Sequence, residues 1–126
     1  MQRRSINIGE FAHASPIPNA SRIGNMIASG FIRGTDPATG KLPPTIEEQC
    51  ALMFSHVKRC VEKGGARVED IIKVTIWVAS IDRKPINAEW VKIFPDPEAM
   101  PARQVCVMEM EPGVLIQCDF LAVVQG

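Results

Sequence analysis

The segment Val114–Val124 constrains the fold most, because both of its faces are apolar. Its β-branched and aromatic residues predict a strand, and strand side chains alternate between two faces. One face would carry Leu115, Leu121 and Val123, and the other Val114, Ile116, Cys118, Phe120 and Val124. A strand of this kind needs cover on both sides. The sheet that contains it must therefore be packed on both faces.

Two segments predict amphipathic helices that supply part of this cover. In Thr45–Lys63, Thr45 and Glu48 form a T-x-x-E capping box. Apolar residues then recur at three- and four-residue spacing until the glycine pair at 64–65, which ends a helix. Lys84–Phe94 predicts a second, shorter helix with a proline in its first turn.

Short strands are predicted before, between and after these helices. They are a strand within Arg3–Asn19, then Arg22–Ala28, Phe31–Arg33, Ile71–Ala79 and Arg103–Met110. The interleaved order predicts an α+β domain with one mixed sheet and both helices on one of its faces. Because two helices cannot cover both faces, we expect a homo-oligomer to bury the second face.

Composition limits the classes of function. The 126 residues suggest one domain, and 14 basic residues balance 14 acidic ones, so nothing global favours nucleic acid or an anionic membrane. No apolar run approaches the roughly 20 residues of a membrane span, and no signal peptide is visible, so we expect a cytoplasmic protein. Four cysteines and two histidines lack zinc-site spacing. We expect packed thiols and no metal.

Arg103 stands at the start of an apolar strand. A guanidinium keeps its charge and needs an anionic partner there. If residues 111–113 close a tight hairpin, Cys106 faces Cys118. The alternation of side chains along the two strands then places five other residues on a common face. That face would carry Arg103, Val105, Val107, Gln117 and Asp119. Arg103 then either pairs with Asp119, its diagonal neighbour, or binds the carboxylate of a ligand.

Three stretches together resemble a known family. They are IGNMIASGFI…DPATGKLPPTIEEQ (Ile23–Gln49), VEDIIKVTIWVASIDRKPINAEWVKIFP…PARQV (Val68–Val105) and GVLIQCDFLAVV (Gly113–Val124). They are similar to the RidA/YjgF family, whose members are also described as endoribonuclease L-PSP-like. The resemblance implies a single Rid-type domain over residues 1–126 with a chorismate-mutase-like, mixed six-stranded sheet and two helices on one face. It also implies that three subunits pack their sheets into a homotrimeric barrel.

The resemblance also implies an activity. Proteins of this kind hydrolyse small reactive enamine and imine acids to 2-keto acids and ammonia, in clefts between subunits and without metal or organic cofactor. The family's carboxylate-binding arginine corresponds to Arg103. The other implied substrate-binding residues are Ser29, Gly30, Phe31, Asn87, Val105 and Ile17.

The chain departs from the family pattern at the position that matters most for catalysis. Gln117 stands where the family has a glutamate that positions water. An amide can orient water but cannot take its proton at neutral pH. Asp119, two residues on, is the candidate that would supply the missing carboxylate. Ile17 also replaces an aromatic residue, and Val105 a cysteine, with Cys106 next to it.

Several alternatives stay open at this point. The chain is either an enamine/imine deaminase or a non-catalytic protein of the same fold that binds small carboxylates or regulates a partner. RNA cleavage, a further association of the family, is disfavoured by the neutral charge balance. Ser29-Gly30 equally fits a plain strand break, and Asn87 a helix-surface position. His56 is expected to be exposed on its helix.

Overall fold

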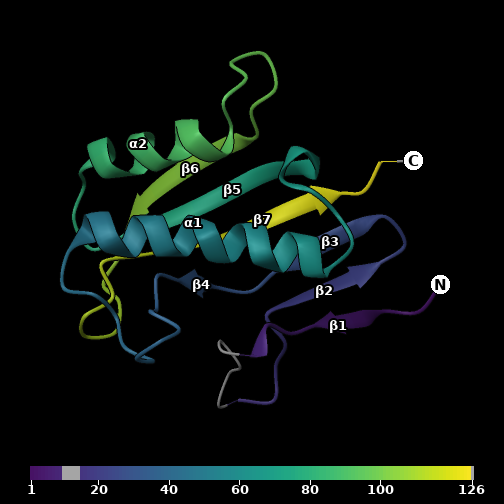
Figure 1. The fold of residues 1–126 in the computed structure, drawn as a ribbon, viewed down its shortest axis with the longest axis horizontal. Helices are drawn as coiled ribbons and strands as arrows, with labels where there is room; N and C mark the ends of the chain where they lie inside the picture. Colours follow the sequence, from purple (N-terminus) through teal and green to yellow (C-terminus); the bar gives the residue numbers. More distant parts are fainter. Residues whose placement is uncertain (10–14, 126) are drawn as a thin grey trace.

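The computed structural model describes residues 1–9 and 15–125. The loop expected before Asn19 falls partly on residues 10–14, outside the described residues. The elements are β1 (Arg4–Ile6), β2 (Ala20–Ile23), β3 (Met26–Ser29), β4 (Ile32–Arg33), α1 (Ile46–Lys63), η2 (Val68–Asp70), β5 (Ile71–Val78), α2 (Arg83–Ile93), β6 (Ala102–Val107) and β7 (Ile116–Val123). Both helices lie on one face of the sheet (Figure 1), which confirms the predicted α+β class.

In the described residues, 1–9 and 15–125, the strands form one mixed sheet of seven strands rather than six. Their order is β1-β2-β3-β7-β5-β6, and β4 pairs with β7 beside this path. Only β5 and β6 run parallel. The additional strand arises because the predicted single strand Arg22–Ala28 is a hairpin of β2 and β3. It turns at Gly24, whose positive φ of 56° suits glycine.

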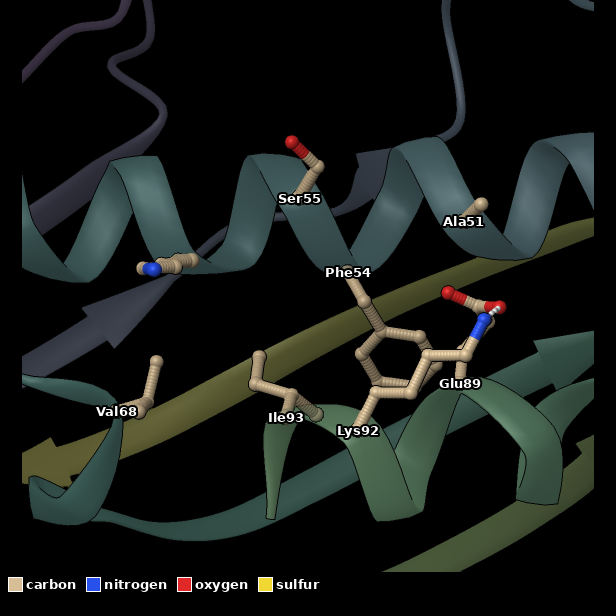
Figure 2. Close-up of a pocket in the computed structure, with 8 residues that line it drawn as sticks. Ala51, Phe54, Ser55, Val68, Glu89, Lys92 and Ile93 are labelled. Atoms are coloured by element: carbon tan, nitrogen blue, oxygen red, sulfur yellow. Dashed lines mark hydrogen bonds and ion pairs between the residues drawn. The ribbon is translucent and has the colours of Figure 1, made fainter. Parts of the chain in front are cut away.

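The first helix begins and ends where the sequence predicts. Thr45 Oγ1 accepts a hydrogen bond from the Glu48 N–H at 3.2 Å and donates to Glu48 Oε1 at 2.9 Å. At the other end, the Gly64 N–H donates to the Cys60 carbonyl at 3.1 Å. The side chain of Phe54 points from α1 towards α2 (Figure 2) and meets the Trp90 ring edge-on at 6.2 Å. The two helices therefore form one layer.

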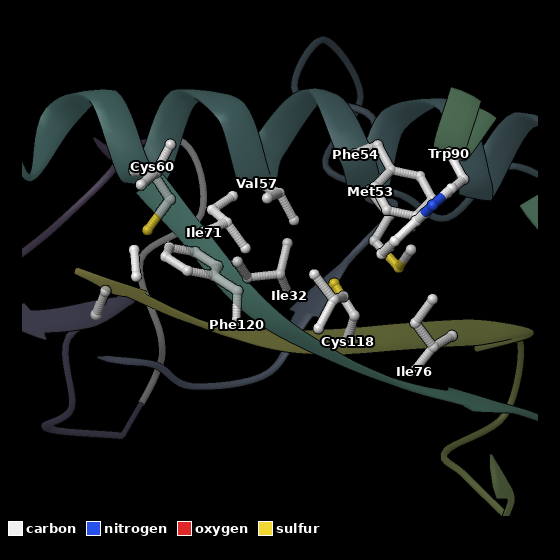
Figure 3. Packing of buried hydrophobic residues seen from close by; sticks show 14 of the residues in the cluster. Ile32, Met53, Phe54, Val57, Cys60, Ile71, Ile76, Trp90, Cys118 and Phe120 are labelled. Atoms are coloured by element: carbon white, nitrogen blue, oxygen red, sulfur yellow. The ribbon is translucent and has the colours of Figure 1, made fainter. Parts of the chain in front are cut away.

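The core lies between this helical layer and the sheet (Figure 3). Helix α1 contributes Cys50, Met53, Phe54, Val57, Cys60 and Val61, and the sheet contributes Ile27, Ile32, Val74, Ile76, Val78, Ile116, Cys118, Phe120 and Ala122. On β5 and β7 these are alternate residues, as expected for strands with one covered face. No helix of the described residues is long and apolar enough to cross a membrane.

The other face of the sheet carries no helix in the described part of the chain, and we call it the helix-free face. On it, Trp77 of β5 is partly buried by its neighbours. Ile23 and Met26 are each 50% exposed and Val123 is 37% exposed, and their strand pairing places them together. Exposed apolar side chains that lie together in this way are typical of an interaction surface.

The predicted hairpin between the last two strands is wrong. Strand β5 lies between β6 and β7: Ile76 is opposite Val105 on one side and opposite Cys118 on the other. Because α2 connects β5 to β6, these two strands run parallel, and the last strand takes the free edge of β5. Cys106 therefore does not face Cys118.

Candidate functional site

The Ser-Gly element lies where one sheet edge is interrupted. Strands β3 and β4 both pair with β7, at residues 121–123 and 117–118, and Ser29-Gly30 separates them. Ser29 Oγ accepts a hydrogen bond from the Phe120 N–H at 2.9 Å and so bridges the break. The Gly30 N–H donates to the Asn19 carbonyl at 2.9 Å. The structure thus gives this element a structural role and leaves Gly30 exposed.

An aromatic pair follows directly on the helix-free face. The ring of Phe31 meets that of Trp77 edge-on, with centroids 4.9 Å apart and planes at 82°. Phe31 is 45% exposed. It therefore offers an apolar wall beside the strand break, in the place where the family resemblance puts a substrate-binding residue.

Gln117 lies next to this pair and is only 2% exposed. It is opposite Trp77 on β5 and opposite Arg33 on β4, so all three side chains share the helix-free face. Gln117 Oε1 accepts a hydrogen bond from Arg33 Nε at 3.2 Å. Arg33 Nη1 forms an ion pair with Glu111 at 3.1 Å. The amide oxygen of Gln117 is therefore held by a cation.

Sequence reasoning missed Arg33 as a member of this site. The signal was present, because an arginine that ends a short apolar strand needs an acceptor, as Arg103 does. What the sequence does not reveal is that β4 pairs with β7 across 84 residues.

Asp119 also lies on the helix-free face, opposite Thr75 of β5. Burial raises the pKa of its carboxyl, while Lys73 acts in the opposite direction. Two residues along a strand separate Asp119 from Gln117, so it is a neighbour of the Arg33–Gln117 pair. An ion pair with Arg103, one of the two alternatives for that arginine, does not form within the described chain, because the two side chains are on opposite faces of the sheet.

Arg103 occupies the helix side of the edge strand β6, opposite Val74. Its Cζ lies 5.0 Å from the ring centroid of Trp90 on α2, a cation–π contact. Burial lowers the pKa of Arg103, and the nearby Arg83 adds to this effect. No carboxylate among residues 1–9 and 15–125 pairs with it. The guanidinium is thus held on an aromatic face with its charge uncompensated.

The remaining predicted residues are Val105, Asn87 and Ile17. Val105 follows Arg103 on the helix side of β6 and packs against the core. Asn87 is exposed on α2, and Ile17 is 55% exposed in the segment before β2. The expected common face of Arg103, Val105, Val107, Gln117 and Asp119 therefore splits into two groups, which one chain does not bring together.

The cysteines and metal ligands form no centre in the described part of the chain. Cys118 is buried and Cys106 is exposed, with β5 between their strands. Within residues 1–9 and 15–125, no three His, Cys, Asp or Glu side chains are grouped so that they could hold a metal ion.

A groove of about 340 Å³ lies elsewhere, between α1 and α2 (Figure 2). It is lined by Ala51, Phe54, Ser55, Lys58, Val68, Glu89, Lys92 and Ile93. At its rim, Lys92 Nζ pairs with Glu89 at 2.7 Å. None of the predicted site residues lines this groove.

Comparison with known proteins gives consistent matches. A family model described as endoribonuclease L-PSP matches residues 10–124. A RutC family protein of Aquifex aeolicus is 34% identical over 102 residues, covering 79% of this chain and 81% of that protein. An Escherichia coli protein named 2-iminobutanoate/2-iminopropanoate deaminase is 31% identical over 115 residues, covering 89% and 90%. The crystal structure of the E. coli YjgF gene product superposes with a TM-score of 0.85 at 28% identity, covering 97% of this chain and 99% of that one.

Proposed function

This chain belongs to the endoribonuclease L-PSP family, the family that its motifs resemble, and from that premise we propose that it hydrolyses small imine and enamine acids. The products would be 2-keto acids and ammonia. The relative named 2-iminobutanoate/2-iminopropanoate deaminase supports this class of reaction.

The observation that carries the proposal is the state of Arg103. The side chain is held on the Trp90 ring with no carboxylate partner in the described residues. A guanidinium presents parallel N–H groups that match a carboxylate with two hydrogen bonds. A substrate carboxylate would complete at Arg103 the ion pair that the chain itself does not form.

The separation of the site residues into two groups supports the assembly of several subunits. Arg103 and Val105 lie on the helix side of one sheet edge, whereas Phe31 and Gln117 lie on the helix-free face. We therefore propose the homotrimer as the state in which Arg103 of one subunit meets Phe31 and Gln117 of the next. The exposed apolar residues of the helix-free face are the surface that such packing would bury.

The reaction requires mainly that the substrate and the attacking water are correctly positioned. An enamine first takes a proton at carbon to become the imine; water then adds to the C=N carbon, and ammonia leaves as the C=O bond forms. Arg103 holds the carboxylate and fixes that carbon, while a water beside Gln117 attacks it. Fixing two reactants in this way accelerates a reaction without a strong base.

One observation favours a second candidate, a binding protein of the same fold without turnover. The Gln117 oxygen that would accept a hydrogen bond from water already accepts one from Arg33. The amide of Gln117 then keeps one acceptor lone pair and its N–H groups, and neither can take a proton from water at neutral pH.

The test is the rate of keto-acid release from freshly generated imino acids of several chain lengths. We expect acceleration by the wild type and a loss of about 10- to 100-fold in Arg103→Ala, as for a charged hydrogen-bonded pair. Arg4→Ala, at an exposed position of β1, is the matched control. Folded trimer that accelerates none of these reactions would contradict the deaminase proposal and favour the binding protein.

A further inference from the structure

The contacts around Gln117 point to the substrate class. We propose that Arg33 and Gln117 form a second carboxylate-binding subsite, so that the preferred ligand is a dicarboxylic imino or keto acid. This inference rests on the proposed function for the first carboxylate, at Arg103, and adds a specificity-determining role for Arg33.

The amide of Gln117 has a defined direction. Its Oε1 accepts from Arg33 Nε at 3.2 Å, so its Nε2 amino group points the other way along the side chain. This is the one hydrogen bond of the Gln117 side chain within residues 1–9 and 15–125, so Nε2 has no acceptor there. Arg33 Nη2 likewise has no hydrogen-bond partner in this part of the chain. The groups of the pair that lack any partner here are therefore donors, Gln117 Nε2 and Arg33 Nη2, and the ligand group that fits donors is an acceptor such as a carboxylate.

Arg33 is available to a ligand. Its present ion-pair partner, Glu111, has a side chain 72% exposed, and the side chain of Arg33 is 32% exposed. Exposed ion pairs contribute little free energy and are readily replaced. A ligand carboxylate would exchange for that of Glu111 while the Arg33–Gln117 hydrogen bond stays in place.

The surroundings of the Arg33–Gln117 pair also suit a dicarboxylate. Phe31 and Trp77 form an apolar wall beside it, which suits the carbon chain between two carboxylates. Asp119 lies further along β7 on the same face, opposite Thr75 and with Lys73 near enough to affect its pKa. A second negative ligand group is thus directed to the Arg33 end and away from Asp119.

The test is calorimetric binding of two stable keto acids of equal chain length, 2-oxoglutarate and 2-oxopentanoate, to the intact protein. We expect the wild type to prefer 2-oxoglutarate by about tenfold, as for one charged hydrogen-bonded contact. Arg33→Met should remove this preference without weakening 2-oxopentanoate. Arg33→Lys should retain part of it, and the exposed Arg4→Met should change nothing.

If Arg33→Met does not fold, a second variant tests the same proposal. Glu111→Gln, at an exposed loop position, removes the competing carboxylate and should tighten 2-oxoglutarate binding about two- to fivefold. It should leave 2-oxopentanoate binding as in the wild type. Equal binding of the two acids by the wild type, or a preference that survives Arg33→Met, would overturn the proposal.

Turnover measured in parallel separates this inference from the deaminase proposal. A preference for 2-oxoglutarate that depends on Arg33, without hydrolysis of any imine, supports the subsite and contradicts the enzyme. Hydrolysis of neutral imines with no preference for the dicarboxylate supports the enzyme and contradicts the subsite.

Discussion

The four cysteines differ strongly in burial, and therefore in reactivity, according to their positions in the fold. Cys50, Cys60 and Cys118 are buried in the core, and Cys106 is exposed on the edge strand. Burial raises the pKa of Cys50 to about 12 and that of Cys60 to about 11, and it also raises the pKa of Cys118. A buried thiol with a raised pKa is inert, since the thiolate is the reactive form.

We therefore expect one fast-reacting thiol per chain at neutral pH. A chromogenic disulfide reagent should label Cys106 at least tenfold faster than the other three, and Cys106→Ser should abolish the fast phase. In denaturant all four thiols should react together. A fast phase that persists in Cys106→Ser would show that a core thiol is accessible.

Single polar residues were the hardest to place from the sequence. His56 is 3% exposed rather than exposed, and its ring Nε2 donates to the Thr35 carbonyl at 2.6 Å. Gln49 is fully buried, with its amide bonded to Pro43, Gly113 and Leu115. Both are covered by loops that come from elsewhere in the chain, so helical periodicity alone does not reveal their burial.

At the scale of elements, local signals were sufficient for the helices. The start of α1 depends on Thr45, which both accepts from and donates to Glu48. We expect Thr45→Ala to lower the free energy of unfolding by about 1 kcal/mol, the usual cost of removing an N-cap. Urea unfolding measures this directly.

The control for that prediction is Ser55→Ala, on the exposed side of the same helix. Because alanine is the better helix former, this change should be neutral or slightly stabilising. A loss as large as that of Thr45→Ala would assign the effect to helix composition instead of the cap.

Strand pairing needed more than local signals. The hairpin of β2 and β3 carried one, a Gly-Asn pair at its turn, which the sequence interpretation passed over. The partners of β6 and β7 carried none, because β5 pairs with both from a distance along the chain. The separation of Arg103 from Gln117 follows from this pairing. The sequence therefore identifies candidate site residues, but it does not reveal how they are arranged in space.

At the scale of the whole molecule, the helix-free face is the surface that we propose for assembly. Met26 is 50% exposed there, beside Ile23 and Val123. We expect Met26→Glu to dissociate the proposed trimer, because a buried unpaired carboxylate is costly. Light scattering coupled to size exclusion should show a fall from three subunits to one at micromolar concentration.

The matched control is Val91→Glu, which introduces the same charge at a 53% exposed position of α2. It should leave the mass unchanged. A wild type that is monomeric at high concentration, or a Met26→Glu variant that stays trimeric, would contradict burial of this face.

The place of β7 has a consequence for synthesis. The strand closest to the C-terminus of this sequence lies in the middle of the sheet, with β3 and β4 along one edge and β5 along the other. While a ribosome is still adding residues 116–123, the two halves of the sheet lack the strand that pairs with both of them. The native core can close only after that segment has left the exit tunnel. Until then the edges of the earlier strands remain unpaired and accessible to chaperones and to neighbouring nascent chains.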